Sequence, residues 1–187
     1  MILFFDTSAL VKLFHEEEGS EVVTRLMRPR DNQIWISELA GLEFLSAVFR
    51  RLRNKEISDE QLNEAVKGFE MQINSFNVEP LGQVILKEAE VLLKRHGKKR
   101  GLRTLDALQI GTFSLISEKG WYFVAADEML CEVAKDMGFD VINPLTTLAT
   151  KKVTIYTEIL LSCEYCVEQN LFPRAHLRGI FNRHGNH

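Results

Sequence analysis

The chain has 187 residues, of which 45% are hydrophobic and 26% are charged, and its formal net charge is −3 at pH 7. This composition is typical of one globular domain with an appendage, and it excludes nucleic-acid binding through an overall positive charge. Three cysteines are too few for a disulfide framework, and the N-terminus has neither a basic segment nor a long apolar stretch. We therefore expect a cytoplasmic protein without a membrane span.

The first predicted element is a strand at residues 2–5, Ile-Leu-Phe-Phe, which ends at Asp6. A continuous apolar run is typical of a central parallel strand that is buried on both faces. Open α/β sheets bind their ligands at the carboxyl ends of such strands. Asp6, with Thr7 and Ser8 after it, is therefore the first candidate for a functional site.

Helices and strands then alternate along the chain. We predict helices at residues 9–14, 20–27, 38–54, 58–73, 83–95, 104–117 and 128–137, and further strands at 34–36, 76–79, 121–126 and 139–142. This alternation predicts an α/β protein whose central parallel sheet is covered on both faces, a three-layer α/β/α sandwich.

Two of the predicted helices carry an acid that is a further candidate for the site. Ser37 is expected to cap the helix at 38–54, on whose flank Glu43 lies. Its predicted core stripe consists of Leu42, Leu45, Val48, Phe49 and Leu52. The helix at 104–117 is apolar almost all round, so we expect it to be buried, which makes Asp106 in its first turn conspicuous.

These acids are expected to meet. Asp6 and Asp127 each follow an apolar strand, and strand carboxyl ends share one edge of the sheet with the helix N-termini that follow them. Asp106 should lie at that edge as well, and Glu43 should reach it from its helix.

Each acid also has a structural explanation. Asp127 could cap the helix at 128–137, and Asp106 could favour its helix dipole with Thr104 as the cap. Glu43 could be a surface acid. Asp6 is harder to explain by a structural role alone. Burying a carboxylate at the end of a strand costs free energy, and a function for that carboxylate would account for the cost.

Taken together, the four carboxylates indicate a bound cation. Two carboxylates about 4 Å apart repel by roughly 4 kcal/mol at an effective dielectric constant near 20. A site of carboxylate oxygens without paired histidine or cysteine favours Mg²⁺ or Mn²⁺ over zinc. Such a cation can activate water and neutralise charge on a phosphoryl group, so the pattern favours metal-dependent phosphodiester hydrolysis.

The stretches around these acids resemble PIN-domain ribonucleases of the VapC toxin type. The matching stretches are residues 5–10 (FDTSAL), 37–43 (SELAGLE), 102–109 (LRTLDALQ), 124–128 (VAADE) and 138–144 (GFDVINP). They follow one another in the family's order. The resemblance implies a PIN-like nuclease domain at residues 1–147, and we expect a partly helical C-terminal extension at 148–187.

The resemblance further implies that the four acids form a Mg²⁺ or Mn²⁺ site. Asp6 and Asp106 would be the most direct ligands, and Glu43 and Asp127 would hold metal-bound waters or a second ion. The family cleaves RNA endonucleolytically. Its toxin members are normally paired with a small antitoxin, whose C-terminal segment lies across the site, and they usually form homodimers.

Other residues are candidates for binding the substrate. Thr7 or Ser8 would orient Asp6 or contact the scissile phosphate. Basic residues in a predicted loop at 96–101, together with Arg103, could also contact phosphates. A solvated loop without a function would account for these basic residues equally well. The basic candidates are Lys98, Lys99, Arg100 and Arg103.

Alternatives to a toxin ribonuclease remain open. A stand-alone PIN nuclease in RNA processing would carry the same acids. A phosphatase that forms a phosphoaspartate would need a second Asp two positions after Asp6, where this chain has Ser8. A non-catalytic RNA-binding module would not need all four acids. In the extension, Cys163, Cys166, His176 and His184 miss the usual zinc-finger spacing.

Overall fold

A computed structural model describes residues 1–146, and these contain a five-stranded sheet in the order β3-β2-β1-β4-β5 with every neighbouring pair parallel. The strands are β1 (Ile2–Phe5), β2 (Gln33–Ser37), β3 (Asn77–Glu79), β4 (Trp121–Val124) and β5 (Asp140–Ile142). β1 is central, and its Phe4 is level with Trp35 of β2 and Phe123 of β4. All five predicted strands are therefore confirmed.

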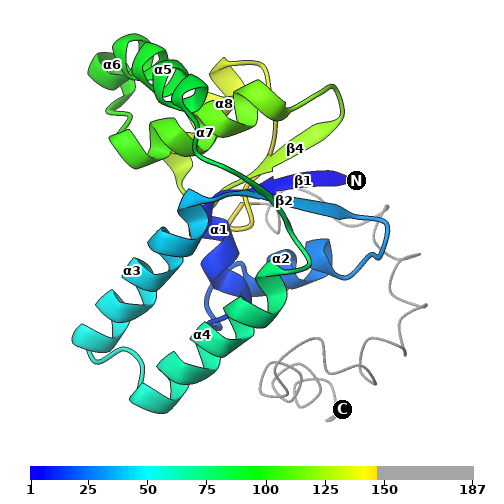
Figure 1. Ribbon diagram of the computed structural model, residues 1–187, viewed down its shortest axis with the longest axis vertical. Coiled ribbons are helices and arrows are strands. Elements are labelled where there is room, and N and C mark those ends of the chain that lie inside the picture. The colour runs from blue at the N-terminus through cyan, green and yellow to red at the C-terminus, as the bar shows by residue number, and fades with distance from the viewer. Residues whose placement is uncertain (147–187) are drawn as a thin grey trace.

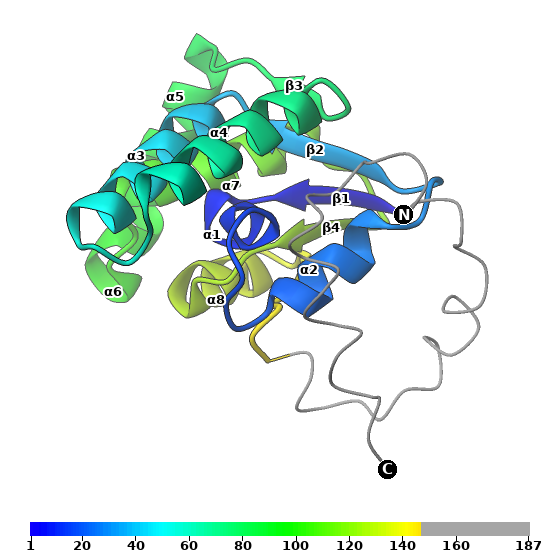
Figure 2. The same cartoon turned by 90° about the horizontal axis from the view of Figure 1, so that it is seen from below.

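Helices cover both faces of this sheet, so the predicted three-layer α/β/α sandwich is confirmed (Figure 1). The helices are α1 (Thr7–Leu10), α2 (Ser20–Met27), α3 (Leu39–Arg53), α4 (Asp59–Ile73), α5 (Gln83–Leu92), α6 (Lys98–Arg100), α7 (Thr104–Ile116) and α8 (Glu128–Asp136), with a 3₁₀ turn η1 (Val11–Leu13) and a π-helical turn η2 (Leu93–Gly97). α3 and α4 lie side by side and are joined by a short turn (Figure 2).

Side chains of β1 alternate between two hydrophobic cores. Leu3 and Phe5 enter the core formed with α1 to α4, and Phe4 enters the core formed with α5, α7 and α8. Phe4 stacks on Phe123 with ring centroids 5.9 Å apart and lies 5.5 Å from the ring of Phe113. Since strand side chains point alternately to opposite faces, the uninterrupted apolar run of β1 is what burial on both faces requires.

The predictions for α3 need correction. The helix begins at Leu39 with Glu38 in the N-cap position, and Ser37 belongs to β2, although its hydroxyl accepts a hydrogen bond from the Leu39 N–H at 3.3 Å. Leu42 and Phe49 are 69% and 44% exposed, so the predicted core stripe was partly wrong. The buried residues of this helix are Leu39, Ala40, Phe44 and Val48.

The prediction that residues 96–101 form a loop is also wrong. The chain continues from α5 through η2 into α6, and Gly101 ends this run in the left-handed conformation at φ 72°. Glycine adopts that conformation at low cost and commonly ends helices.

No helix in residues 1–146 is long and apolar enough to cross a membrane. The predicted extension at residues 148–187, with its cysteine and histidine pairs, lies outside the described part of the chain.

Candidate active site

Asp6 follows β1 directly and is 5% exposed. It is the N-cap of α1, and its Oδ2 accepts hydrogen bonds from the backbone N–H of Ser8 at 2.9 Å and from the Ser8 hydroxyl. The pKa of Asp6 is raised from 3.8 to about 7. Burial is the largest cause, the nearby charges of Glu43 and Asp106 contribute to the increase, and the hydrogen bonds from Ser8 oppose it. The site therefore contains a carboxylate whose charge is poorly compensated within the protein.

Ser8 connects the ends of the two central strands. Its Oγ donates to Asp6 and accepts a hydrogen bond at 2.9 Å from the backbone N–H of Ala126, just beyond β4. Ser8 thus orients Asp6, which is one of the two roles predicted for Thr7 or Ser8. It also occupies the position where a phosphoaspartate phosphatase would need its second Asp.

Thr7 makes a different contact. Its hydroxyl donates to Oε2 of Glu43 at 2.6 Å, and Nε2 of Gln109 donates to the same oxygen at 2.6 Å. Gln109 Nε2 also lies 2.9 Å from the Thr7 hydroxyl oxygen. Three helices, α1, α3 and α7, therefore converge on one carboxylate oxygen, and Glu43 is held in place at the edge of the site.

Gln109 was missed by the sequence analysis. It is completely buried in α7, one turn after Asp106, and its Oε1 is buried without a hydrogen-bond partner among the described residues. An amide inside an otherwise apolar helix was a signal, because buried polar groups need partners. The pattern alone could not identify Glu43 as that partner.

Asp106 and Asp127 are linked by Arg103. The guanidinium of Arg103 contacts Asp106 at 2.8 Å through Nε and Asp127 at 3.3 Å through Nη2. Asp127 is also the N-cap of α8, where its Oδ1 accepts from the Leu130 N–H at 2.9 Å. The cap interpretation of Asp127 is thus confirmed, and its other oxygen faces the site. The N-cap of α7 is Arg103, which has no side-chain capping bond, so Thr104 is not the cap.

None of the other basic candidates forms a hydrogen bond or ion pair with the four acids within residues 1–146. Arg100 forms ion pairs with Glu132 at 2.6 Å and with Asp136 at 2.7 Å, both on α8. Lys98 and Lys99 are exposed on α6. Arg103 is therefore the basic candidate that contacts the predicted site, and substrate binding by the other three remains a prediction.

The donor chemistry fits a hard divalent cation. In the conformation described for residues 1–146, no three His, Cys, Asp or Glu side chains converge closely enough to hold a metal ion. The four acids nevertheless supply only carboxylate oxygens, the ligands that Mg²⁺ and Mn²⁺ prefer. Asp6 lies within electrostatic reach of Glu43 and Asp106, and a cationic guanidinium already bridges Asp106 and Asp127.

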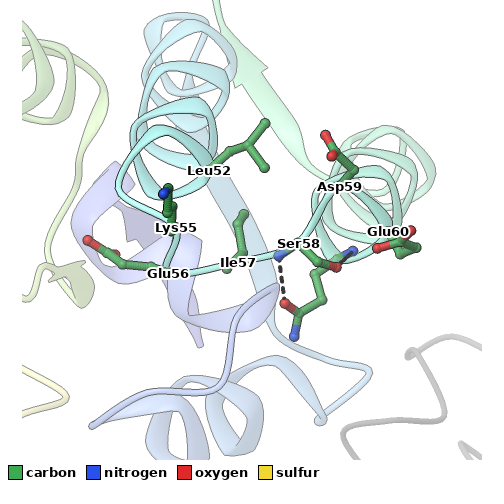
Figure 3. Close-up of a pocket in the computed structure, with 8 residues that line it drawn as sticks. Leu52, Lys55, Glu56, Ile57, Ser58, Asp59 and Glu60 are labelled. Carbon is green, nitrogen blue, oxygen red and sulfur yellow. Dashed lines mark hydrogen bonds between the residues drawn. The ribbon is translucent and has the colours of Figure 1, made fainter.

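A shallow hollow adjoins this edge. It has a volume of about 430 Å³ and is lined by Asp127, Glu128, Met129 and Glu132. A larger hollow of about 640 Å³ lies at the turn between α3 and α4, where the Gln61 side chain accepts from the Ser58 N–H (Figure 3). Its nearest member on α3, Leu52, is nine residues from Glu43, about 14 Å along the helix axis. The α3–α4 hollow is therefore separate from the acids.

The chain is an α/β/α protein, and two of the predicted site acids, Asp6 and Asp127, follow the carboxyl ends of its parallel strands β1 and β4. A model of the PIN domain family matches residues 3–140, and the chain belongs to this family, whose members are nucleases. The resemblance seen in the sequence is thereby confirmed at the level of the family. The comparison with curated proteins finds no match.

Solved structures share this fold. FitAcB from Neisseria gonorrhoeae is 17% identical with a TM-score of 0.57, over 77% of this chain and 98% of that one. VapC20 from Mycobacterium tuberculosis, described as a toxin that cleaves the sarcin-ricin loop, is 18% identical with a TM-score of 0.56, over 76% and 99%. VapBC-1 from nontypeable Haemophilus influenzae is 13% identical with a TM-score of 0.52, over 77% and 98%.

Proposed function

We propose that this protein is an endoribonuclease that uses Mg²⁺ or Mn²⁺ at the carboxylates of Asp6, Glu43, Asp106 and Asp127. The observation that carries the proposal is the arrangement around Asp6. This acid is buried at the end of the central strand, and the charges of Glu43 and Asp106 lie close enough to raise its pKa. Several carboxylates in one place need a cation, and a bound divalent ion would meet that need.

Asp6 and Asp106 are the proposed direct ligands, and Glu43 and Asp127 are proposed to hold metal-bound waters or a second ion. When bound, the cation supplies a water of lowered pKa and neutralises charge that develops on the phosphate. Ser8 holds Oδ2 of Asp6 in a fixed orientation. Thr7 and Gln109 both bind Oε2 of Glu43, and no hydrogen bond from residues 1–146 reaches Oε1, so this oxygen remains for water.

RNA is the proposed substrate, and its phosphates would be attracted by the basic residues near Asp106. Arg103 is 68% exposed at the edge of the site, and Lys98 and Lys99 are exposed on the preceding helix α6. Arg100 is proposed to contribute less, because its guanidinium is occupied by Glu132 and Asp136. A net charge of −3 makes such a local basic group necessary for a polyanionic substrate.

We further propose that the protein is a toxin with an antitoxin partner and that it forms homodimers in the cytoplasm. Structures with this fold include a toxin–antitoxin complex from Klebsiella pneumoniae and a VapBC complex from Rickettsia felis. Leu42 and Phe49 leave apolar surface exposed on α3, the helix that carries Glu43, as a protein partner would require. A small open reading frame directly beside the gene would favour a toxin, and its absence would favour a stand-alone RNA-processing nuclease.

The test of the enzymatic proposal is cleavage of labelled RNA by the purified full chain with Mg²⁺, with Mn²⁺ or with EDTA. Asp6→Asn and Asp106→Asn are each expected to abolish cleavage while the circular dichroism spectrum stays unchanged. Asp140→Asn is the matched control, because Asp140 is exposed where β5 begins, at the opposite edge of the sheet. Full activity in either site variant, or in EDTA, would contradict the proposed site.

A further inference from the structure

Arg103 bridges two of the acids that are proposed as metal ligands, Asp106 and Asp127. Its Nε lies 2.8 Å from Oδ2 of Asp106, and its Nη2 lies 3.5 Å from Oδ1 of Asp106 and 3.3 Å from Oδ2 of Asp127. One guanidinium thereby pairs with two carboxylates, that of Asp106 in α7 and that of Asp127 at the N-cap of α8. A planar fork of N–H donors can do this, whereas a lysine ammonium is a point charge.

We propose that Arg103 is a displaceable internal counter-ion, which pairs with Asp106 and Asp127 while the site is free of metal and gives way when a divalent cation binds. This inference rests on the proposed function, because it takes those two acids as metal ligands. The carboxylate oxygens that the guanidinium now engages are among those a divalent cation would need. Metal and arginine therefore compete for them.

The surroundings of Arg103 allow the exchange. Its side chain is 68% exposed, while the side chains of Asp106 and Asp127 are 14% and 30% exposed, so the arginine can turn into solvent and the acids remain. Arg103 is also the N-cap of α7 without a side-chain capping bond, so the helix start does not depend on its guanidinium. Exposed ion pairs are weak, and a divalent cation can displace them.

Competition of this kind lowers the apparent affinity for metal. When only a fraction of molecules has the binding-competent arrangement, the apparent dissociation constant rises in inverse proportion to that fraction. The metal-free protein in turn avoids leaving Asp106 and Asp127 as neighbouring uncompensated charges. Once displaced, the guanidinium lies at the edge of the site, where the proposed RNA phosphate would arrive.

The experiment measures Mn²⁺ binding by isothermal titration calorimetry on the full chain, without RNA. The variants are Arg103→Gln and Arg100→Gln. Arg100 is the matched control, because it lies three residues earlier, carries the same charge and pairs with Glu132 and Asp136 on α8 instead of the four acids. Circular dichroism checks that each variant is folded.

Arg103→Gln is expected to bind Mn²⁺ about three- to tenfold more tightly than the wild type. Arg100→Gln should change the affinity by less than about twofold, since it alters only the long-range field. Binding by Arg103→Gln alone, with none by the wild type, would support the proposal most strongly.

Three outcomes would overturn it in distinguishable ways. Equal affinities of the wild type and Arg103→Gln would remove the counter-ion role and leave the metal site intact. No Mn²⁺ binding by any variant would refute the metal site itself, and the counter-ion role with it. Equal tightening in both arginine variants would show a general charge effect and would also refute the exchange.

Discussion

Gln109 and Glu43 lie on different helices, yet the amide nitrogen of Gln109 donates to Oε2 of Glu43 at 2.6 Å. The two helices, α7 and α3, carry buried residues in different hydrophobic cores for most of their length. This hydrogen bond, together with the one from Thr7, connects them across the end of the sheet. A partly exposed acid is thus positioned from the buried interior.

The contact between Gln109 and Glu43 predicts that Gln109→Leu reduces cleavage without unfolding the protein. Leucine is of similar size and removes the buried Oε1, which has no hydrogen-bond partner within residues 1–146. We therefore expect the free energy of unfolding to change by less than about 1 kcal/mol. Cleavage should fall about tenfold or more, because Glu43 loses a donor that fixes its orientation.

The control is Thr112→Val on the same buried helix, where the hydroxyl bonds only to the Leu108 carbonyl at 2.8 Å. Initial rates on labelled RNA and urea unfolding measure the two effects. Wild-type cleavage in Gln109→Leu would show that Thr7 alone positions Glu43.

Asp6→Asn is predicted to stabilise the metal-free protein. The pKa of Asp6 is about 7 in the folded state against an ordinary value of 3.8, so the folded protein binds this proton more tightly than the unfolded chain does. The associated stability is fully present below about pH 4, and it is lost as the pH rises through 7. At pH 8 the neutral amide should therefore raise the free energy of unfolding by about 1 to 3 kcal/mol.

Urea unfolding in EDTA at several pH values tests this. The difference between wild type and Asp6→Asn should be small near pH 4 and should grow until about pH 7. An equal difference at every pH would mean that the charge of Asp6 is not its cause.

Metal binding should weaken as the pH falls through 7. A carboxylate must lose its proton before it binds a cation, and the pKa of Asp6 is raised to about 7 by burial and by Glu43 and Asp106. We expect the apparent Mn²⁺ affinity to fall up to about tenfold for each pH unit below that value. Calorimetric titrations between pH 6 and pH 8 measure it, and an affinity that is independent of pH would argue against Asp6 as a ligand.

Asp127 is predicted to serve both as a cap and in the site, and two substitutions separate these roles. Asp127→Ser retains a side chain that can accept from the Leu130 N–H, so stability should be kept. Asp127→Ala should cost about 1 kcal/mol of stability. Both variants are expected to lose cleavage of RNA. Cleavage of RNA by Asp127→Ser would show that Asp127 serves only as the cap of α8.

The sequence predicted the parts of the site that follow from element order. Asp6 directly follows an apolar strand and Asp106 lies in the first turn of an apolar helix, so local patterns placed both at the same end of the sheet. Gln109 could not be assigned a role in this way, because its partner Glu43 is 66 residues away in the sequence and only packing brings them together.

The errors have equally specific causes. The apolar residues of α3 occupy more than one side of the helix, and periodicity alone does not decide which side is buried. Phe44 and Val48 pack inward, while Leu42 and Phe49 remain exposed. Residues 96–101 were predicted to form a basic loop, but the helical path continues to Arg100 and ends at Gly101.

The order of the strands explains why the acids lie where they do. After β1 the chain passes to helices α1 and α2 on one face of the sheet, and after β4 it passes to α8 on the other. The boundary between β1 and β4 is thus a topological switch point, where connecting segments diverge to opposite faces and where α/β sheets commonly bind their ligands. Asp6 and Asp127 flank this point. The switch point is a property of the chain path, so replacing the acids beside it should remove the proposed chemistry and leave the strand order unchanged.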